Sequence, residues 1–240
     1  MYRFFWIMAT LLVFLFTRRR MRGQQQTPRS GGLLIVSNHL GLLDPFVIGT
    51  KLPRRLYILT KVELFSWPVI GWMARTADSI PIRRGQSDRE AIRRLLEHLE
   101  AGHAILLFPE GTYPQGALPP AMLKAQPGAA MLALRSGATI LPVGISGTQH
   151  IWTKRGWPWN LFWRWPVEVT IGAPYRPSVP PGISQKHALA LVTDEMMLKI
   201  AALLPPAYRG YYGKLPTDDE QQIISDLLPS PSAASPALDS

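Results

Sequence analysis

The chain has 240 residues, of which 47% are hydrophobic, so it can form one sizeable domain and still leave room for a membrane segment and a tail. Its 26 Lys and Arg residues against 16 Asp and Glu give a formal charge of +10, which favours anionic partners such as lipid headgroups, phosphorylated substrates, acidic carrier proteins or nucleic acid. Cysteine is absent, which excludes a disulfide scaffold, a thiolate nucleophile and cysteine-based metal sites.

Residues 1–22 are predicted to anchor the chain to a membrane. Phe4 to Phe16 is almost wholly apolar, and the arginine cluster Arg18 to Arg22 follows it. A signal peptide would carry its charges before the apolar core, so we expect the segment to be retained. About 15 residues at about 1.5 Å each span about 22 Å, less than a hydrocarbon core of about 30 Å. The segment is therefore an interfacial anchor or a tilted span, with the arginines on the cytoplasmic side. The alternative is a buried helix of a soluble domain.

After a polar, turn-rich linker at 23–32, strands and helices alternate along residues 33–212. Strands are predicted over 33–37, 56–60, 79–82, 104–108, 139–145 and 167–171. Helices are predicted over 65–73 with an interruption at Pro68, from a Ser87/Glu90 capping box to 101, and over 128–136 and 184–204. This order predicts an α/β domain with a largely parallel central sheet flanked by helices. The tail at 213–240 is expected to be poorly ordered, with a brief helix near 223–228.

A histidine and an aspartate follow the first predicted strand closely. Functional groups of parallel sheets lie beyond the carboxyl ends of the strands, where His39 and Asp44 are expected. An imidazole can take a proton from an attacking hydroxyl near neutral pH, and the carboxylate would fix its tautomer and stabilise the imidazolium. Two simpler interpretations remain. Asp44, followed by Pro45, is also a good helix cap, and a lone turn histidine is usually bonded to backbone.

A second polar turn, Glu110-Gly111-Thr112, ends the strand at 104–108. It supplies a carboxylate, a flexible backbone and a hydroxyl that suit an acceptor's hydroxyls or a phosphate. The arginines Arg83 and Arg84 could form a fork for a phosphate. Each of these groups could instead be solvated at the surface.

Taken together and in order, these motifs resemble the 1-acylglycerol-3-phosphate acyltransferase family of glycerolipid acyltransferases. The similar blocks are Asn38-His39-x4-Asp44, the Ile-Pro-Ile-Arg-Arg-Gly block ending at Gly85, Phe-Pro-Glu-Gly-Thr ending at Thr112, and Leu-Pro-Val-Gly at 141–144. The resemblance covers about residues 33–171. It implies that His39 and Asp44 are the catalytic pair, that Arg84, Glu110 and Gly111 bind a phosphorylated acceptor, and that Pro142 shapes the site.

The chain departs from this family pattern at two places. Family members commonly have Arg-Ser after Glu-Gly-Thr, where this chain has Tyr113-Pro114, and often a basic residue at the position of Gln126-Pro127. Two potential phosphate contacts are therefore missing, and charge-assisted contacts of this kind are worth about 1.5–3 kcal/mol each. The acceptor could therefore be a lysolipid other than lysophosphatidate.

The predicted activity is transfer of an acyl group from acyl-coenzyme A or acyl carrier protein to a lysophospholipid hydroxyl at the membrane, with no cofactor. Enzymatic alternatives are glycerol-3-phosphate acylation and thioester hydrolysis. A non-catalytic basic module for membranes or nucleic acid, drawing on the tryptophans between Trp152 and Trp165, would explain neither His39 nor Asp44, so no nucleic-acid partner is predicted. No metal site is predicted either, because the remaining histidines lack ligand spacing: His98, His103, His150 and His187.

Overall fold

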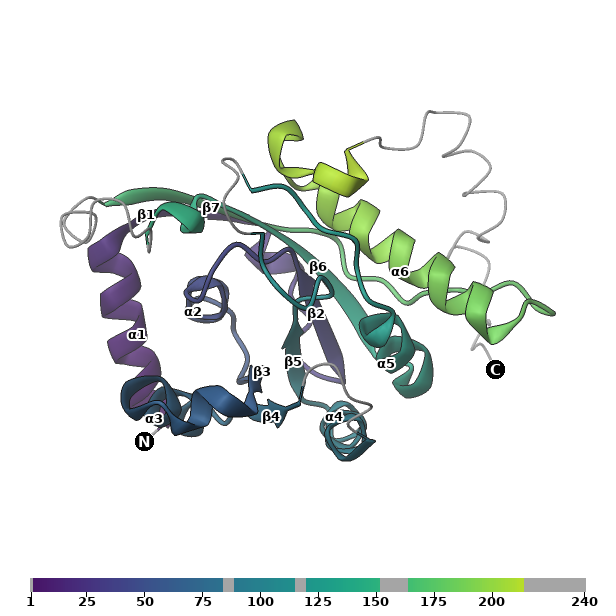
Figure 1. Cartoon of the computed structure of the whole chain (residues 1–240), viewed down its shortest axis with the longest axis horizontal. Coiled ribbons are helices and arrows are strands. Elements are labelled where there is room, and N and C mark those ends of the chain that lie inside the picture. The colour runs from purple at the N-terminus through teal and green to yellow at the C-terminus, as the bar shows by residue number, and fades with distance from the viewer. Residues whose placement is uncertain (1, 84–88, 115–119, 152–163, 214–240) are drawn as a thin grey trace, which may run out of the picture.

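The computed structural model describes residues 2–83, 89–114, 120–151 and 164–213 (Figure 1). Within these ranges one sheet of seven strands has the order β1-β7-β6-β2-β5-β3-β4. The strands are β1 (Thr17–Arg22), β2 (Leu33–Ser37), β3 (Leu56–Lys61), β4 (Ile80–Ile82), β5 (Ala104–Leu107), β6 (Thr139–Ser146) and β7 (Trp165–Ile171). The α-helices are α1 (Tyr2–Phe16), α2 (Asp44–Gly49), α3 (Pro68–Thr76), α4 (Arg89–Glu100), α5 (Gly128–Ser136) and α6 (Gln185–Ala202). Short 3-10 turns occupy Gln24–Gln26, Val62–Ser66, Thr148–His150, Pro206–Tyr208 and Gly210–Tyr212.

The predicted α/β fold with a largely parallel sheet is confirmed. The strand pairs β2 with β5, β2 with β6, β3 with β5, β3 with β4 and β1 with β7 are parallel, and β6 with β7 is antiparallel. The strands β2, β5 and β6 lie side by side, so their carboxyl ends share one edge of the sheet. The turns that follow these three strands therefore lie at this edge.

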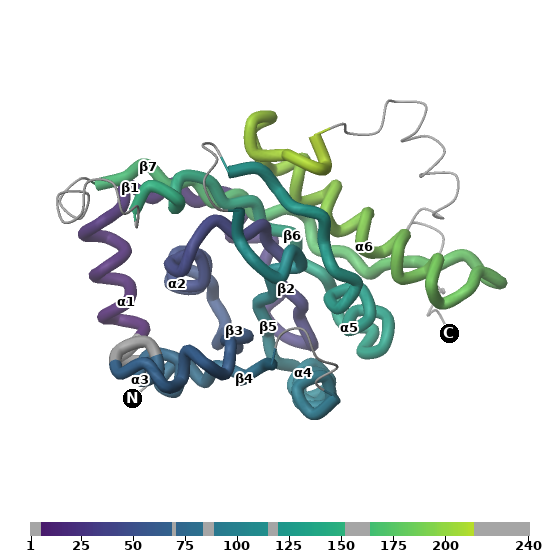
Figure 2. Tube along the Cα trace, in the orientation of Figure 1, coloured from purple at the N-terminus to yellow at the C-terminus, as the bar shows by residue number. Residues whose placement is uncertain are grey.

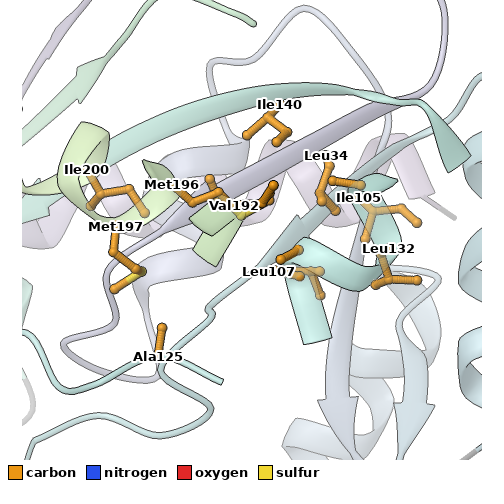
Figure 3. Close-up of a cluster of buried hydrophobic side chains, with 14 of the residues drawn as sticks. Leu34, Ile105, Leu107, Ala125, Leu132, Ile140, Val192, Met196, Met197 and Ile200 are labelled. Atoms are coloured by element: carbon orange, nitrogen blue, oxygen red, sulfur yellow. The ribbon is translucent and has the colours of Figure 1, made fainter. Parts of the chain in front are cut away.

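One face of the sheet packs against α4, α5 and α6. Leu34, Ile105 and Ile140 point from adjacent strands toward this layer, where Val192, Met196 and Ile200 of α6 meet them (Figure 3). All six of these side chains are almost completely buried. Burying a side chain of this size contributes about 1.5–3 kcal/mol, so this layer fixes the strand positions on which the site depends.

The opposite face is covered by α1 and α2, with α1 lying across α2 and reaching α3 (Figure 2). Alternate strand residues such as Leu33 and Ile35 face this layer together with Val47 and Ile48 of α2. The two-residue alternation of a strand thus places each β2 side chain in one of two cores. A strand buried on both faces explains the continuous apolar run at 33–36.

The arginine cluster after α1 is an edge strand of the sheet, an element not predicted from the sequence. β1 pairs in parallel with β7, and Arg19 reaches inward to donate to the Val47 carbonyl at 2.7 Å and to the Thr50 hydroxyl. Arg18, Arg20 and Arg22 alternate outward and are exposed. Charged side chains are common on edge strands, so this strand carries no apolar pattern that would predict it from sequence. Residues 23–32 accordingly join two strands of one sheet.

Most other elements agree with their predicted positions. The helix at 128–136 has the predicted bounds, and the break at Pro68 is confirmed because a 3-10 turn over Val62–Ser66 precedes α3. Four predicted features lie outside the described residues: the Ser87 cap, Arg84, the brief helix near 223–228, and the tryptophans from 152 to 163.

Candidate active site

The catalytic pair predicted from the sequence lies together, buried at the carboxyl end of β2. His39 Nδ1 is 2.8 Å from Asp44 Oδ2. An ionised carboxylate only accepts hydrogen bonds, so Nδ1 carries the proton of the neutral imidazole and Nε2 is left as its acceptor nitrogen. This is the tautomer that a general base requires.

The Asp44 carboxylate is directed back into the turn that contains His39. Its Oδ2 also accepts hydrogen bonds from the backbone N–H groups of Leu40, at 2.6 Å, and Gly41, at 2.9 Å. The helix α2 begins at Asp44, and its cap position, Leu43, makes no side-chain cap bond. The interpretation of Asp44 as a helix cap is therefore wrong, because its oxygens satisfy the preceding turn and the imidazole instead.

Two aromatic rings also contact the imidazole of His39. The Phe108 ring stacks on His39 with centroids 4.1 Å apart and planes 17° apart. The Tyr113 ring meets it edge-on, with centroids 5.1 Å apart at 79°. Both rings come from the turn after β5, so they add rotational restraint to the orientation that Asp44 sets.

Two further side chains join the end of β2 to β6. Asn38 donates from Nδ2 to the Ile145 carbonyl at 2.9 Å, and its Oδ1 accepts from the Ile145 N–H at 2.8 Å. The Thr148 hydroxyl donates to Asp44 Oδ1 at 2.5 Å. Sequence reasoning missed Thr148, since it lies 104 residues from Asp44 and its only local sign is a glycine before it.

Glu110 is buried beside His39, with both oxygens bonded to backbone. Oε1 accepts from the His39 N–H at 3.0 Å and Oε2 from the Leu123 N–H at 2.7 Å. Burial raises the pKa of Glu110 to about 7, against the lowering effect of these two hydrogen bonds. The observed role of this carboxylate is to tie the histidine turn to the segment at 120–125.

A raised pKa makes the contribution of Glu110 to stability depend on pH. The folded protein holds this proton up to about pH 7, whereas an unfolded glutamate releases it near pH 4.3. The contribution is thus present at low pH and is lost as pH rises toward 7. We expect Glu110→Gln, which cannot titrate, to lose less stability relative to wild type at pH 8 than at pH 5. Thermal unfolding of both proteins at the two pH values measures this difference, and an equal or opposite difference would contradict it.

The remaining predicted site residues are placed less closely. Gly111 has a φ of +70°, which glycine adopts without strain, and Thr112 is exposed on the same turn. Arg83 is exposed just after β4. Pro142 lies within β6 opposite Val36, with its ring packed toward Gly172. The structure therefore brings Glu110 to the turn of His39 and Asp44 and places Pro142 in the neighbouring strand β6.

An apolar cavity of about 250 Å³ opens beside the Phe108-Pro109 turn. Its walls come from β3, β4, β5, α4 and α5, and from the turn that leads to Gly111. Lining residues include Ile82, Leu95, Leu107, Met131 and Leu132. It is a space for an apolar group, and Phe108, whose ring stacks on His39, is one of its lining residues. Among the described residues, no group of three or more His, Asp or Glu side chains is arranged to hold a metal ion.

The fold and the buried pair define an α/β domain equipped for general base chemistry. The model of the Acyltransferase family matches residues 18–146, more than half of the chain, and the chain therefore belongs to this family. A lyso-ornithine lipid O-acyltransferase from Pseudomonas aeruginosa is 37% identical over 143 residues, which cover 59% of this chain and 52% of that protein.

Other relatives are named for a different substrate. A chloroplast 1-acyl-sn-glycerol-3-phosphate acyltransferase from Brassica napus is 28% identical over 147 residues, which cover 60% of this chain and 41% of that protein. The crystal structure of the 1-acyl-sn-glycerophosphate acyltransferase PlsC from Thermotoga maritima superposes with a TM-score of 0.62 at 26% identity, covering 81% of this chain and 75% of that one. The chain spans about half the length of the curated relatives it matches.

Proposed function

We propose that this protein transfers a fatty acyl group from a thioester donor to the free hydroxyl of a lysolipid in the synthesis of membrane lipids. The observation that carries this proposal is the buried pair in which Asp44 holds His39 Nδ1 at 2.8 Å. Direct acyl transfer to an alcohol needs one base of this kind and no covalent enzyme intermediate, which suits a chain without cysteine.

In the proposed reaction, His39 Nε2 takes the proton of the lysolipid hydroxyl while the hydroxyl oxygen attacks the thioester carbonyl carbon. The tetrahedral intermediate then collapses with cleavage of the carbon–sulfur bond, and the imidazolium returns its proton to the departing thiolate. Asp44 stays ionised and stabilises the imidazolium between these two steps. The donor is acyl-coenzyme A or acyl carrier protein, and the apolar cavity beside Phe108 has the character that suits a fatty chain.

The acceptor that fits this site best is a lysolipid without a phosphate, such as a lyso-ornithine lipid. Tyr113 meets His39 edge-on at the position where the resembled family commonly has arginine. Both Glu110 oxygens are bonded to backbone N–H groups, and a carboxyl group has no positive charge with which to bind a phosphate. The relative from Pseudomonas aeruginosa is named for a lyso-ornithine lipid. Lysophosphatidate is the second candidate, supported by the names of the plant relative and of PlsC.

A panel of acceptors separates these candidates. Purified protein in detergent would be given a labelled acyl thioester with lyso-ornithine lipid, lysophosphatidate or glycerol 3-phosphate, and each product identified by mass spectrometry. We expect the acylated ornithine lipid to form fastest. Faster acylation of lysophosphatidate would select the second candidate, and no acylated lipid from any acceptor would refute the proposed function.

Membrane association is the second part of the proposal, and α1 supports it. Within the described residues no helix is long and apolar enough to cross a bilayer. However, α1 leaves a row of large apolar side chains exposed, with Ile7 at 59%, Leu11 at 55% and Phe14 at 68%. The nearby α3 region adds exposed Trp67 and Trp72. An apolar helix face flanked by tryptophans suits a helix lying in the bilayer interface.

Charged substitutions on this face should release the protein from membranes. Deletion of residues 1–22 would also remove β1, so we choose the triple variant Ile7→Glu, Leu11→Glu and Phe14→Glu. We expect it to fold normally and to stay in the supernatant when phospholipid vesicles are sedimented. Leu191→Glu, on the exposed side of α6, is the matched control and should still sediment. Full sedimentation of the triple variant would contradict the interfacial role of α1.

A further inference from the structure

The second oxygen of the Asp44 carboxylate has a partner of its own. Asp44 is 0% exposed, and its Oδ2 already accepts hydrogen bonds from the imidazole and from two backbone N–H groups. Oδ1 accepts the hydroxyl proton of Thr148 at 2.5 Å, and Thr148 is 3% exposed. A buried carboxylate oxygen without a hydrogen bond is costly, so this hydroxyl has a strong effect on how the carboxylate is oriented.

Thr148 is held in place from both sides. It begins a 3-10 turn directly after β6, and the preceding Gly147 has a φ of +94°. A Cβ at Gly147 would lie 2.1 Å from the Pro166 carbonyl oxygen, so only glycine lets the chain turn here against β7. On the other side, Asn38 fixes the exit of β2 to Ile145 through two hydrogen bonds. The hydroxyl and the carboxylate are therefore carried by one rigid unit formed by β2, β6 and β7.

We propose that Thr148 is a positioning residue for the acyl transfer proposed above. It does not touch the reacting atoms. Its hydroxyl anchors Oδ1, which aims Oδ2 at His39 Nδ1 and keeps the imidazole in the Nδ1-protonated tautomer, with Nε2 free to accept the substrate proton. Thr148, Asp44 and His39 thus form a chain of two hydrogen bonds that joins the ends of the neighbouring strands β6 and β2.

Thr148→Ser and Thr148→Ala differ by one oxygen atom, so they isolate the hydroxyl. We expect Thr148→Ala to lower kcat about 10- to 100-fold with less than a threefold change in KM, which is the effect of losing a charge-assisted hydrogen bond. Thr148→Ser should remain within about threefold of wild type. Thr193→Val, a buried threonine on α6 whose hydroxyl donates to the Leu189 carbonyl, is the control for a general loss of stability and should keep its kcat.

A double variant tests whether Thr148 acts through Asp44. In an Asp44→Asn background, Thr148→Ala should lower kcat no more than about twofold further, because the partner that it positions has already lost its charge. A full additional loss, an equal loss in Thr148→Ser, or a wild-type kcat in Thr148→Ala would each overturn the proposal.

A spectroscopic readout keeps this test separate from the proposed activity. ¹⁵N NMR of the imidazole reports the tautomer of His39 without any substrate. We expect the Nδ1-protonated form to predominate in wild type and Thr148→Ser, and a mixture of tautomers in Thr148→Ala. An unchanged tautomer in Thr148→Ala would overturn the positioning role. If the wild-type protein shows the expected NMR pattern but transfers no acyl group, the proposed function is refuted and the positioning role of Thr148 is not.

Discussion

Replacement of His39 by alanine should abolish nearly all acyl transfer while the fold is kept. The variant removes the only base of the pair, and a general base contributes roughly 10²- to 10⁴-fold to the rate. Asp44 would keep its hydrogen bonds from Leu40, Gly41 and Thr148, so the turn itself remains supported. We expect kcat to fall by a factor in this range, as measured by the rate of acylated lipid formation under saturating substrates.

The matched control for this prediction is His187→Ala. His187 is exposed in the first turn of α6, far along the chain from the pair, and should be dispensable. Circular dichroism and thermal unfolding would establish that both variants are folded. A folded His39→Ala protein that retains a tenth or more of the wild-type kcat would refute His39 as the base.

Replacement of Asp44 by asparagine should have the next largest effect. The amide oxygen can still accept from His39 Nδ1 and from the backbone N–H groups of Leu40 and Gly41, so much of the hydrogen-bond geometry of the turn survives. The negative charge that stabilises the imidazolium is lost, and we expect kcat to fall roughly 10²- to 10⁴-fold with a small change in KM. Steady-state kinetics of the folded variant measure both quantities.

A double variant, His39→Ala with Asp44→Asn, decides whether the two residues act as one unit. Groups that cooperate in one step show strong non-additivity, so the double variant should be no slower than His39→Ala alone within about threefold. Multiplication of the two single losses would show that Asp44 acts independently of His39, contrary to the geometry of the pair.

Much of this site could be predicted because its parts are local in sequence. His39 and Asp44 lie in one turn after a fully apolar strand, and a strand buried on both faces is recognisable from composition alone. Thr148 and the two backbone bonds of Glu110 could not be predicted, since each depends on the spatial order of β2, β5 and β6. A sequence gives the order of strands along the chain, and the order within the sheet follows only from their packing.

The amino-terminal region illustrates the same limit. The apolar run at 4–16 predicts a helix, and α1 is present. The strand after it is polar and depends on pairing with β7, almost 150 residues later, so nothing local reveals it. As a result, the arginines predicted to flank a membrane anchor are also part of the sheet that carries the site.

The most direct test of the account is to couple thiol release to ester formation. Because the chain has no cysteine, a thiol reagent detects only the product thiol of the donor. Purified protein would be given acyl-coenzyme A or acyl carrier protein charged with a fatty acid, with and without a lysolipid. We predict that thiol appears only when the lysolipid is present, in a one-to-one ratio with the acylated lipid. Thiol release at the same rate without lysolipid would show a thioester hydrolase and contradict acyl transfer.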